Sequence, residues 1–210
     1  PGREQALSQA MRTRGGLTAQ EQPSLADVAR EPGPVSPVEV QPVPGGRTPA
    51  GARPRQGAVE GIVLHHTSGT TLNSALSQNQ IARTGYNYYI DRDGTPYVLA
   101  PDDQRMNHIM PPGSSARIPG AWPSLSSENT IGISVVAQND ADMTDAQRNT
   151  LRSLTTQLAD RHGIDRNNII GHGDIQHTRE RTEGSLSREF REGGRRVAQR
   201  GGTATDVSPA

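Results

Sequence analysis

Metal-binding side chains are concentrated in two short stretches of the chain. Residues 171–184 contain two histidines, three acidic residues and two arginines, bracketed by glycines. Far upstream, residues 62–67 form a run rich in β-branched residues that includes His65 and His66. Histidine and carboxylate are zinc ligands, and hydrolytic zinc sites use three protein ligands and leave a fourth position for water. We therefore expect the fold to bring the two stretches together around one zinc ion.

The candidate ligands are two histidines and one acid. His65 and His172 both stand at the ends of predicted strands, where a loop can direct them at a shared point. Glu183 follows His172 by eleven residues and is the candidate third ligand, while Asp174 and His177 compete with it in the same loop. A zinc-bound water has a pKa of about 7, and the ion also polarises a carbonyl. Such a site hydrolyses amides.

The neighbours of these residues also have structural interpretations. His66 follows His65 and points to the opposite face of the strand, which favours a place in the core or behind the ligands. Arg179 and Arg181 stand beside acidic residues and are equally typical of a solvated salt-bridge cluster.

The elements that position these residues alternate between strands and helices. The helix after Thr144 has a capping box with Gln147 and a final Gly163. The order predicts an α/β domain with a mixed central β-sheet flanked by helices, and sites at strand ends. The predicted elements are a strand over 61–66, a helix over 68–83, a hairpin over 86–99 around an Asp-Gly turn, a strand over 130–137, a helix over 144–163 and a strand at 169–170.

Composition divides the chain into three parts. Eight prolines between residues 23 and 54 predict that residues 1–57 form a Pro/Gly-rich disordered arm or linker. We expect the catalytic domain over 58–192 and a flexible tail over 193–210. The arm and a first residue other than Met favour a processed piece that is tethered to a larger phage or secreted assembly.

Charge and composition exclude several functions. The 22 basic and 22 acidic residues balance, which argues against a nucleic-acid binder that neutralises phosphates. Apolar runs fall short of the roughly 18–20 residues that span a bilayer. The chain has no cysteine, so a metal site must use histidine and carboxylate. All the basic residues are arginines, so a catalytic cation must be Arg or His.

Six segments carry a family resemblance. They are IVLHHTSG, TGYNYYIDRDGTPYVL, NHI, NTIGISVVA, TDAQ with its leucine helix, and IIGHGDIQ followed by RTEG. In this order they resemble the type 2 N-acetylmuramoyl-L-alanine amidases, whose zinc amidase fold is shared with peptidoglycan recognition proteins and some phage lysins. The resemblance runs from about Glu60 to Gly184.

The resemblance implies a role for each matching residue. His65 and His172 match two zinc ligands, and Glu183 stands where the family has an Asp or Cys ligand. Tyr86 matches a tyrosine that positions the water or stabilises the oxyanion. Arg181 stands where the family has a lysine; because arginine keeps its proton, it would act as an electrostatic stabiliser.

Two further histidines are expected to bind substrate. His108 matches a histidine near the cleft of the family, and His66 accompanies the first ligand. Ser134 stands where some members carry a glutamate that is a candidate base.

The implied reaction is hydrolysis of the amide between N-acetylmuramic acid and the first L-alanine of the peptidoglycan stem peptide. It would lyse or remodel the cell wall from an extracytoplasmic place: the periplasm, the medium or a phage particle. The alternative is a non-catalytic peptidoglycan-binding recognition module within a larger phage or secreted protein. Such modules usually lack a complete set of zinc ligands.

Overall fold

The centre of the fold is a six-stranded mixed sheet. The computed structural model describes residues 37–47, 49–109, 122, 124–176 and 179–200, with only the backbone for 194–200. The strand order is β1–β5–β4–β7–β3–β8, and β3 runs parallel to β7 and β8. A separate antiparallel pair joins β2 and β6. The strands are β1 (Gln41–Pro42), β2 (Arg53–Pro54), β3 (Gly61–His66), β4 (Tyr88–Ile90), β5 (Pro96–Val98), β6 (Gln104–Arg105), β7 (Thr130–Val135) and β8 (Ile169–Gly171).

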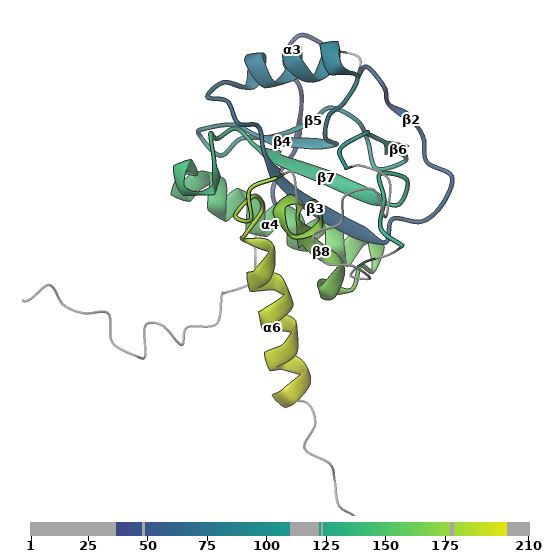
Figure 1. The fold of residues 1–210 in the computed structure, drawn as a ribbon, viewed down its shortest axis with the longest axis vertical. Coiled ribbons are helices and arrows are strands. Elements are labelled where there is room, and N and C mark those ends of the chain that lie inside the picture. The colour runs from purple at the N-terminus through teal and green to yellow at the C-terminus, as the bar shows by residue number, and fades with distance from the viewer. Residues whose placement is uncertain (1–36, 48, 110–121, 123, 177–178, 201–210) are drawn as a thin grey trace, which may run out of the picture. The chain divides into compact units, whose positions relative to one another are not determined.

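Helices flank the sheet, which confirms the expected α/β architecture. Helix α3 (Leu72–Ala82) lies on one side of the sheet and α4 (Asp145–His162) on the other (Figure 1). The short α5 (His172–Ile175) follows β8, and α6 (Ser187–Arg200) packs against β8. Two 3₁₀ turns, η1 (Asp140–Asp142) and η2 (Arg166–Asn168), precede α4 and β8 respectively. Within the described residues, no helix combines the length and apolar character needed to cross a bilayer.

The alternation of β3 decides which way its two histidines point. Ile62 and Leu64 belong to the core on the α4 side, together with the leucines of α4. Val63 packs on the other side, with Ile170 and Leu125. Successive side chains of a strand project to opposite faces, so His65 and His66 project to opposite faces of the sheet.

The sequence predicts the two ends of α4 correctly, but it places the start of α3 too early. Thr144 caps α4 and forms the predicted capping box with Gln147, and Gly163 ends the helix with φ 63°. The helix predicted over 68–83 begins later, at Leu72, where Thr71 accepts a hydrogen bond from Ser74 N. Ser68 has φ 57°, a left-handed conformation that turns the chain after β3 and delays the helix.

Part of the expected arm packs onto the domain. β1 pairs with β5, and Val43 is buried against the α3 side of the sheet. Val38 and Val40 pack against the core on the α4 side. Pro42 is compatible with this pairing because it lies in an edge strand. Packing therefore begins before residue 58.

The end of the chain departs from the expected tail in a similar way. The backbone of α6 continues to Arg200, past the expected boundary at residue 193. The other parts of the expected arm and tail, residues 1–36 and 201–210, lie outside the described residues.

Candidate metal centre and cleft

Three buried side chains converge at the carboxyl edge of the sheet. Among the described residues, His65, His172 and Glu183 form a group whose ligand atoms all lie within 4.8 Å of one another. The two Nδ1 atoms are 2.9 Å apart, and Glu183 Oε1 lies 2.9 Å from His172 Nδ1 and 3.4 Å from His65 Nδ1. Ligands of a tetrahedral zinc ion with bonds of about 2.0–2.1 Å are roughly 3.3 Å apart. The three atoms therefore fit around one ion.

Strand pairing brings the two histidines together. In the parallel pair of β3 and β8, Leu64 is opposite Gly171, so His65 and His172 are the residues that directly follow this pair. Glu183 arrives from the following loop, where its carbonyl accepts a hydrogen bond from Gly173 N at 2.9 Å. The sheet thus places two of the candidate metal ligands, and the loop adds the third.

Neighbouring groups orient both imidazoles. His65 Nε2 lies 3.2 Å from His108 Nδ1, and His108 Nε2 lies 3.1 Å from Thr130 Oγ1. His172 Nε2 contacts Gln176 Oε1, one helical turn further on. When the Nε2 protons are donated to His108 and Gln176, both Nδ1 lone pairs face Glu183. This arrangement of acceptors behind histidine is typical of metal ligands.

The electrostatics favour the protonation states that a metal ligand needs. Burial, aided by the nearby His172, lowers the pKa of His65 to about 3. Burial alone would raise the pKa of Glu183, but its hydrogen bonds with His172 and His65 outweigh burial and hold that pKa well below its usual range. A neutral imidazole and an ionised carboxylate are the forms that bind a metal.

A cleft opens beside this group. Its volume is about 180 Å³, and Tyr86, His108, Gln176 and Arg179 are among its lining residues. The ring of Tyr86 lies 4.6 Å from that of His65, centroid to centroid. Burial and the charge of Glu183 raise the pKa of Tyr86 above its ordinary value, so its hydroxyl stays protonated and available as a donor. Ser134, buried beside the Tyr86 hydroxyl, cannot replace a carboxylate base.

The arginine beside the cleft is Arg179, for which the sequence offered only the interpretation of a surface charge. Both arginines are exposed, but Arg181, the expected stabiliser, is not among the residues that line the cleft, and its carbonyl accepts a hydrogen bond from Arg188. Arg179 lines the cleft, and its charge adds slightly to the lowering of the pKa of His65 and opposes the rise in the pKa of Tyr86. Both arginines stand in the same short loop, so only the path of the backbone distinguishes them.

The remaining candidates lie elsewhere. His66 pairs with Asp140 at 3.2 Å on the other face of the sheet; burial lowers its pKa, but Asp140 and Glu183 outweigh burial and raise it. Asp174 forms an ion pair with Arg191 and is not part of the three-residue group. His177 lies outside the described residues.

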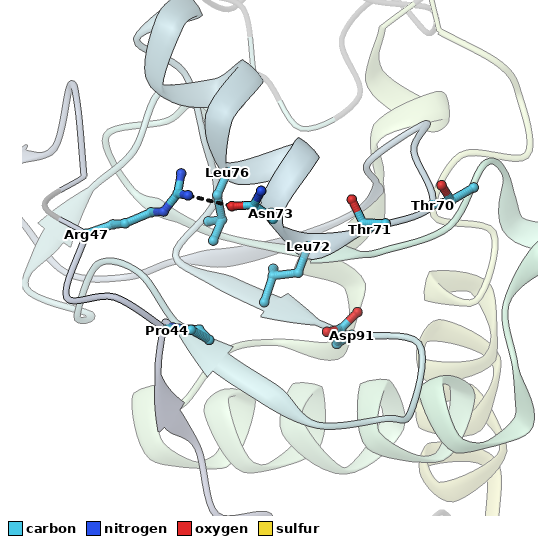
Figure 2. A pocket seen from close by; sticks show the side chains of 8 residues that line it. All are labelled: Pro44, Arg47, Thr70, Thr71, Leu72, Asn73, Leu76 and Asp91. Atoms are coloured by element: carbon cyan, nitrogen blue, oxygen red, sulfur yellow. Dashed lines mark hydrogen bonds between the residues drawn. The ribbon is translucent and has the colours of Figure 1, made fainter.

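A larger cavity of about 380 Å³ lies between the start of α3 and the segment around Pro44 (Figure 2). Arg47 donates hydrogen bonds to Asn73 Oδ1 at 2.5 Å and to Ser77 Oγ at 3.2 Å at this cavity. Among the described residues that line it, Asp91 is the one carboxylate and there is no histidine. Its described lining offers no set of metal ligands, unlike the group beside the smaller cleft.

Fold and site together define an α/β protein with a candidate metal centre at the carboxyl edge of its sheet. A family model described as N-acetylmuramoyl-L-alanine amidase matches residues 55–185, more than half of the chain. The chain therefore belongs to this family and is a peptidoglycan amidase. No curated protein sequence matches the chain.

Solved structures share the fold at low sequence identity. A selenomethionine derivative of AmpD is 20% identical with a TM-score of 0.53, over 72% of this chain and 94% of that chain. The endolysin amidase LysCS from Clostridium intestinale is 21% identical with a TM-score of 0.50, over 68% and 86%. AmiD from E. coli, solved with anhydro-N-acetylmuramic acid-L-Ala-D-γ-Glu-L-Lys, is 19% identical with a TM-score of 0.50, over 75% and 70%.

Proposed function

We propose that the chain is a zinc-dependent amidase that cleaves the bond between N-acetylmuramic acid and L-alanine. The observation that carries the proposal is the buried group of His65, His172 and Glu183, with two imidazole Nδ1 atoms and one carboxylate oxygen facing one point. Zinc bound there would activate a water at neutral pH and polarise the scissile carbonyl. The three side chains would hold the ion, and His108 and Gln176 would keep the two imidazoles in the ligating tautomer.

Tyr86 and Arg179 are the proposed stabilisers of the oxyanion. Both line the cleft beside the metal ligands. A protonated phenol donates a hydrogen bond to the developing negative charge, and a guanidinium contributes a fixed positive charge. His108 lines the same cleft and is the proposed substrate contact. Hydrolysis consumes one water and releases a stem peptide with a free L-alanine amino group.

Relatives support the substrate and the place of action. AmiD was solved with a muropeptide that contains the same amide. We therefore assign peptidoglycan or its soluble fragments as the substrate. The likeness in fold to the endolysin amidase LysCS supports the cell wall outside the cytoplasm as the proposed place of action. A larger phage or secreted assembly that carries the domain remains part of this proposal.

A digest of purified peptidoglycan, read by mass spectrometry, tests the function. We expect free stem peptides and peptide-free glycan in the absence of a chelator and neither product in its presence, with activity restored by added zinc. Peptidoglycan that stays intact while the protein sediments with it would instead support a non-catalytic recognition module. Cleavage at another amide within the stem would instead leave L-alanine attached to the glycan.

Substituting the two arginines separately tests which one serves the cleft. We expect Arg179→Ala to lower kcat on a soluble muropeptide roughly 100-fold, since loss of one oxyanion donor costs about 100- to 1,000-fold. We expect Arg181→Ala to change kcat by less than about threefold, because this side chain is not among the residues that line the cleft. Arg166, which pairs with Asp160 on the surface, provides a control at Arg166→Ala. The opposite order for the two loop arginines would restore the role to Arg181.

A further inference from the structure

A buried carboxylate on the far side of the sheet contacts the loop that carries Glu183. Asp140 is 7% exposed and accepts four hydrogen bonds. Its Oδ1 accepts from His66 Nδ1 and from Gly184 N, both at 3.2 Å. Its Oδ2 accepts from Ser185 N and Ser185 Oγ, both at 2.7 Å. The amidase reaction described above assigns no role to this group.

The donors that Asp140 receives from the loop belong to the residues next to Glu183. Gly184 and Ser185 are the two residues that directly follow Glu183, and the carbonyl of Glu183 itself is held by Gly173 N. Gly184 has φ 77°, and a Cβ there would lie 2.3 Å from the carbonyl oxygen of Leu64. The backbone around Glu183 is therefore clamped between the strands on one side and Asp140 on the other.

Asp140 is itself fixed. Asn139 caps η1 by accepting hydrogen bonds from the backbone N–H groups of Ala141 and Asp142. Arg148 Nη2, from α4, donates to the carbonyl of Asp140 at 2.7 Å. On the other side, His66 is the strand neighbour of His65. Asp140 thus joins a rigid strand to the loop through a network in which each carboxylate oxygen is satisfied.

We propose that Asp140 and His66 are positioning residues that hold Glu183 in place as the third metal ligand. This proposal rests on the proposed function of Glu183. A glutamate has more rotatable bonds than the Asp or Cys that the family resemblance leads one to expect at this position, so its carboxylate is held only if its backbone is held. Adjacent residues of β3 would then serve one metal centre from both faces of the sheet: His65 as a ligand and His66 through Asp140.

The zinc affinity of Asp140→Asn tests the proposal. The amide keeps the size of the side chain but presents an NH₂ group either to the two Ser185 donors or to His66 and Gly184, so one pair of donors loses its acceptor. We expect affinity for Zn²⁺, measured by competition with a chromophoric chelator, to fall about 10- to 100-fold, the usual effect of losing a group that orients a ligand. The visible spectrum of the Co²⁺-loaded protein should change, because it reports coordination. On a soluble muropeptide kcat should fall while KM stays within about twofold.

Matched variants separate positioning from simple stability. His66→Asn keeps a donor near the Nδ1 position and should retain more zinc affinity than His66→Phe, which fills the space without a donor. Asp142→Asn is the control, because Asp142 lies in the same 3₁₀ turn and pairs with Arg92 on the surface. Thermal unfolding should show that zinc stabilises the Asp140→Asn protein less than the parent protein, since ligand stabilisation follows affinity.

The outcomes distinguish this proposal from the function on which it rests. If Glu183→Ala leaves zinc affinity and hydrolysis unchanged, the ligand assignment fails first. If Glu183→Ala weakens zinc binding but Asp140→Asn lowers only the unfolding temperature of the metal-free protein, with zinc affinity and the Co²⁺ spectrum unchanged, the positioning role is overturned. Equal zinc affinity in His66→Asn and His66→Phe would remove His66 from the network.

Discussion

Replacing Glu183 by alanine is expected to lower amide hydrolysis roughly 1,000-fold or more. A bound metal contributes several kcal/mol to transition-state stabilisation, and each 1.4 kcal/mol corresponds to about a tenfold change in rate. Glu183 is 4% exposed and supplies the one carboxylate of the three-residue group. Zinc content of the purified variant and kcat on a soluble muropeptide measure the effect together. Both should fall.

Two further substitutions at Glu183 separate the effect of its charge from the effect of its side-chain length. Glu183→Gln keeps the length and removes the charge, so zinc affinity should fall. Glu183→Asp introduces one of the two ligand types, Asp or Cys, that the resemblance leads one to expect, yet it is one methylene shorter. Because Gly173 N and Asp140 hold the loop backbone, the loop cannot shift to compensate, and we expect this variant to bind zinc more weakly as well.

The exposed Glu180 in the same loop provides the control for this series. Glu180→Ala should retain zinc content and activity, because its side chain is not part of the three-residue group. Full activity of Glu183→Ala, with zinc still bound, would contradict the assignment and move the third ligand to another residue of the loop, such as His177.

Much of the fold follows from local signals in the sequence. The β-branched run before His65 and the capping box of Thr144 are short patterns, and both mark the elements as the structure has them. Residues 37–57 were harder to predict, since prolines dominate the composition while a few valines decide the packing. Val43 is buried only because β5 offers a partner to β1, and that partner is distant in sequence.

The residues of the site also differ in whether local sequence patterns predict them or distant contacts place them. His65 lies near the end of β3 and His172 directly follows β8, and adjacent parallel strands place their ends together, so pattern alone brings the two histidines close. Arg179 and Arg181 differ only in how the loop backbone turns, which depends on the clamp around Glu183. Gln176 had a usable signal, because it follows His172 by one helical turn. Asp140 had none, since its role depends on the contact between a 3₁₀ turn and a distant loop.

Substituting Tyr86 by phenylalanine is expected to lower kcat about 100- to 1,000-fold, the cost of one lost oxyanion donor. Burial and the Glu183 charge raise the pKa of Tyr86, so the phenol is protonated throughout the neutral and mildly alkaline range. The loss should therefore be constant with pH over that range, and KM should change little because the interaction forms in the transition state. Initial rates on a soluble muropeptide, measured across pH, give both parameters.

The phenylalanine retains the ring that packs against His65 and Tyr89, so zinc affinity and the unfolding temperature should stay close to those of the parent protein. Tyr97, on β5 in the same apolar cluster but not among the residues that line the cleft, gives the matched control at Tyr97→Phe. If Tyr86→Phe loses activity only in proportion to lost zinc, the hydroxyl acts on the metal site. If it loses none, stabilisation of the oxyanion falls to Arg179 and the bound metal, and the Arg179→Ala effect should then exceed 100-fold.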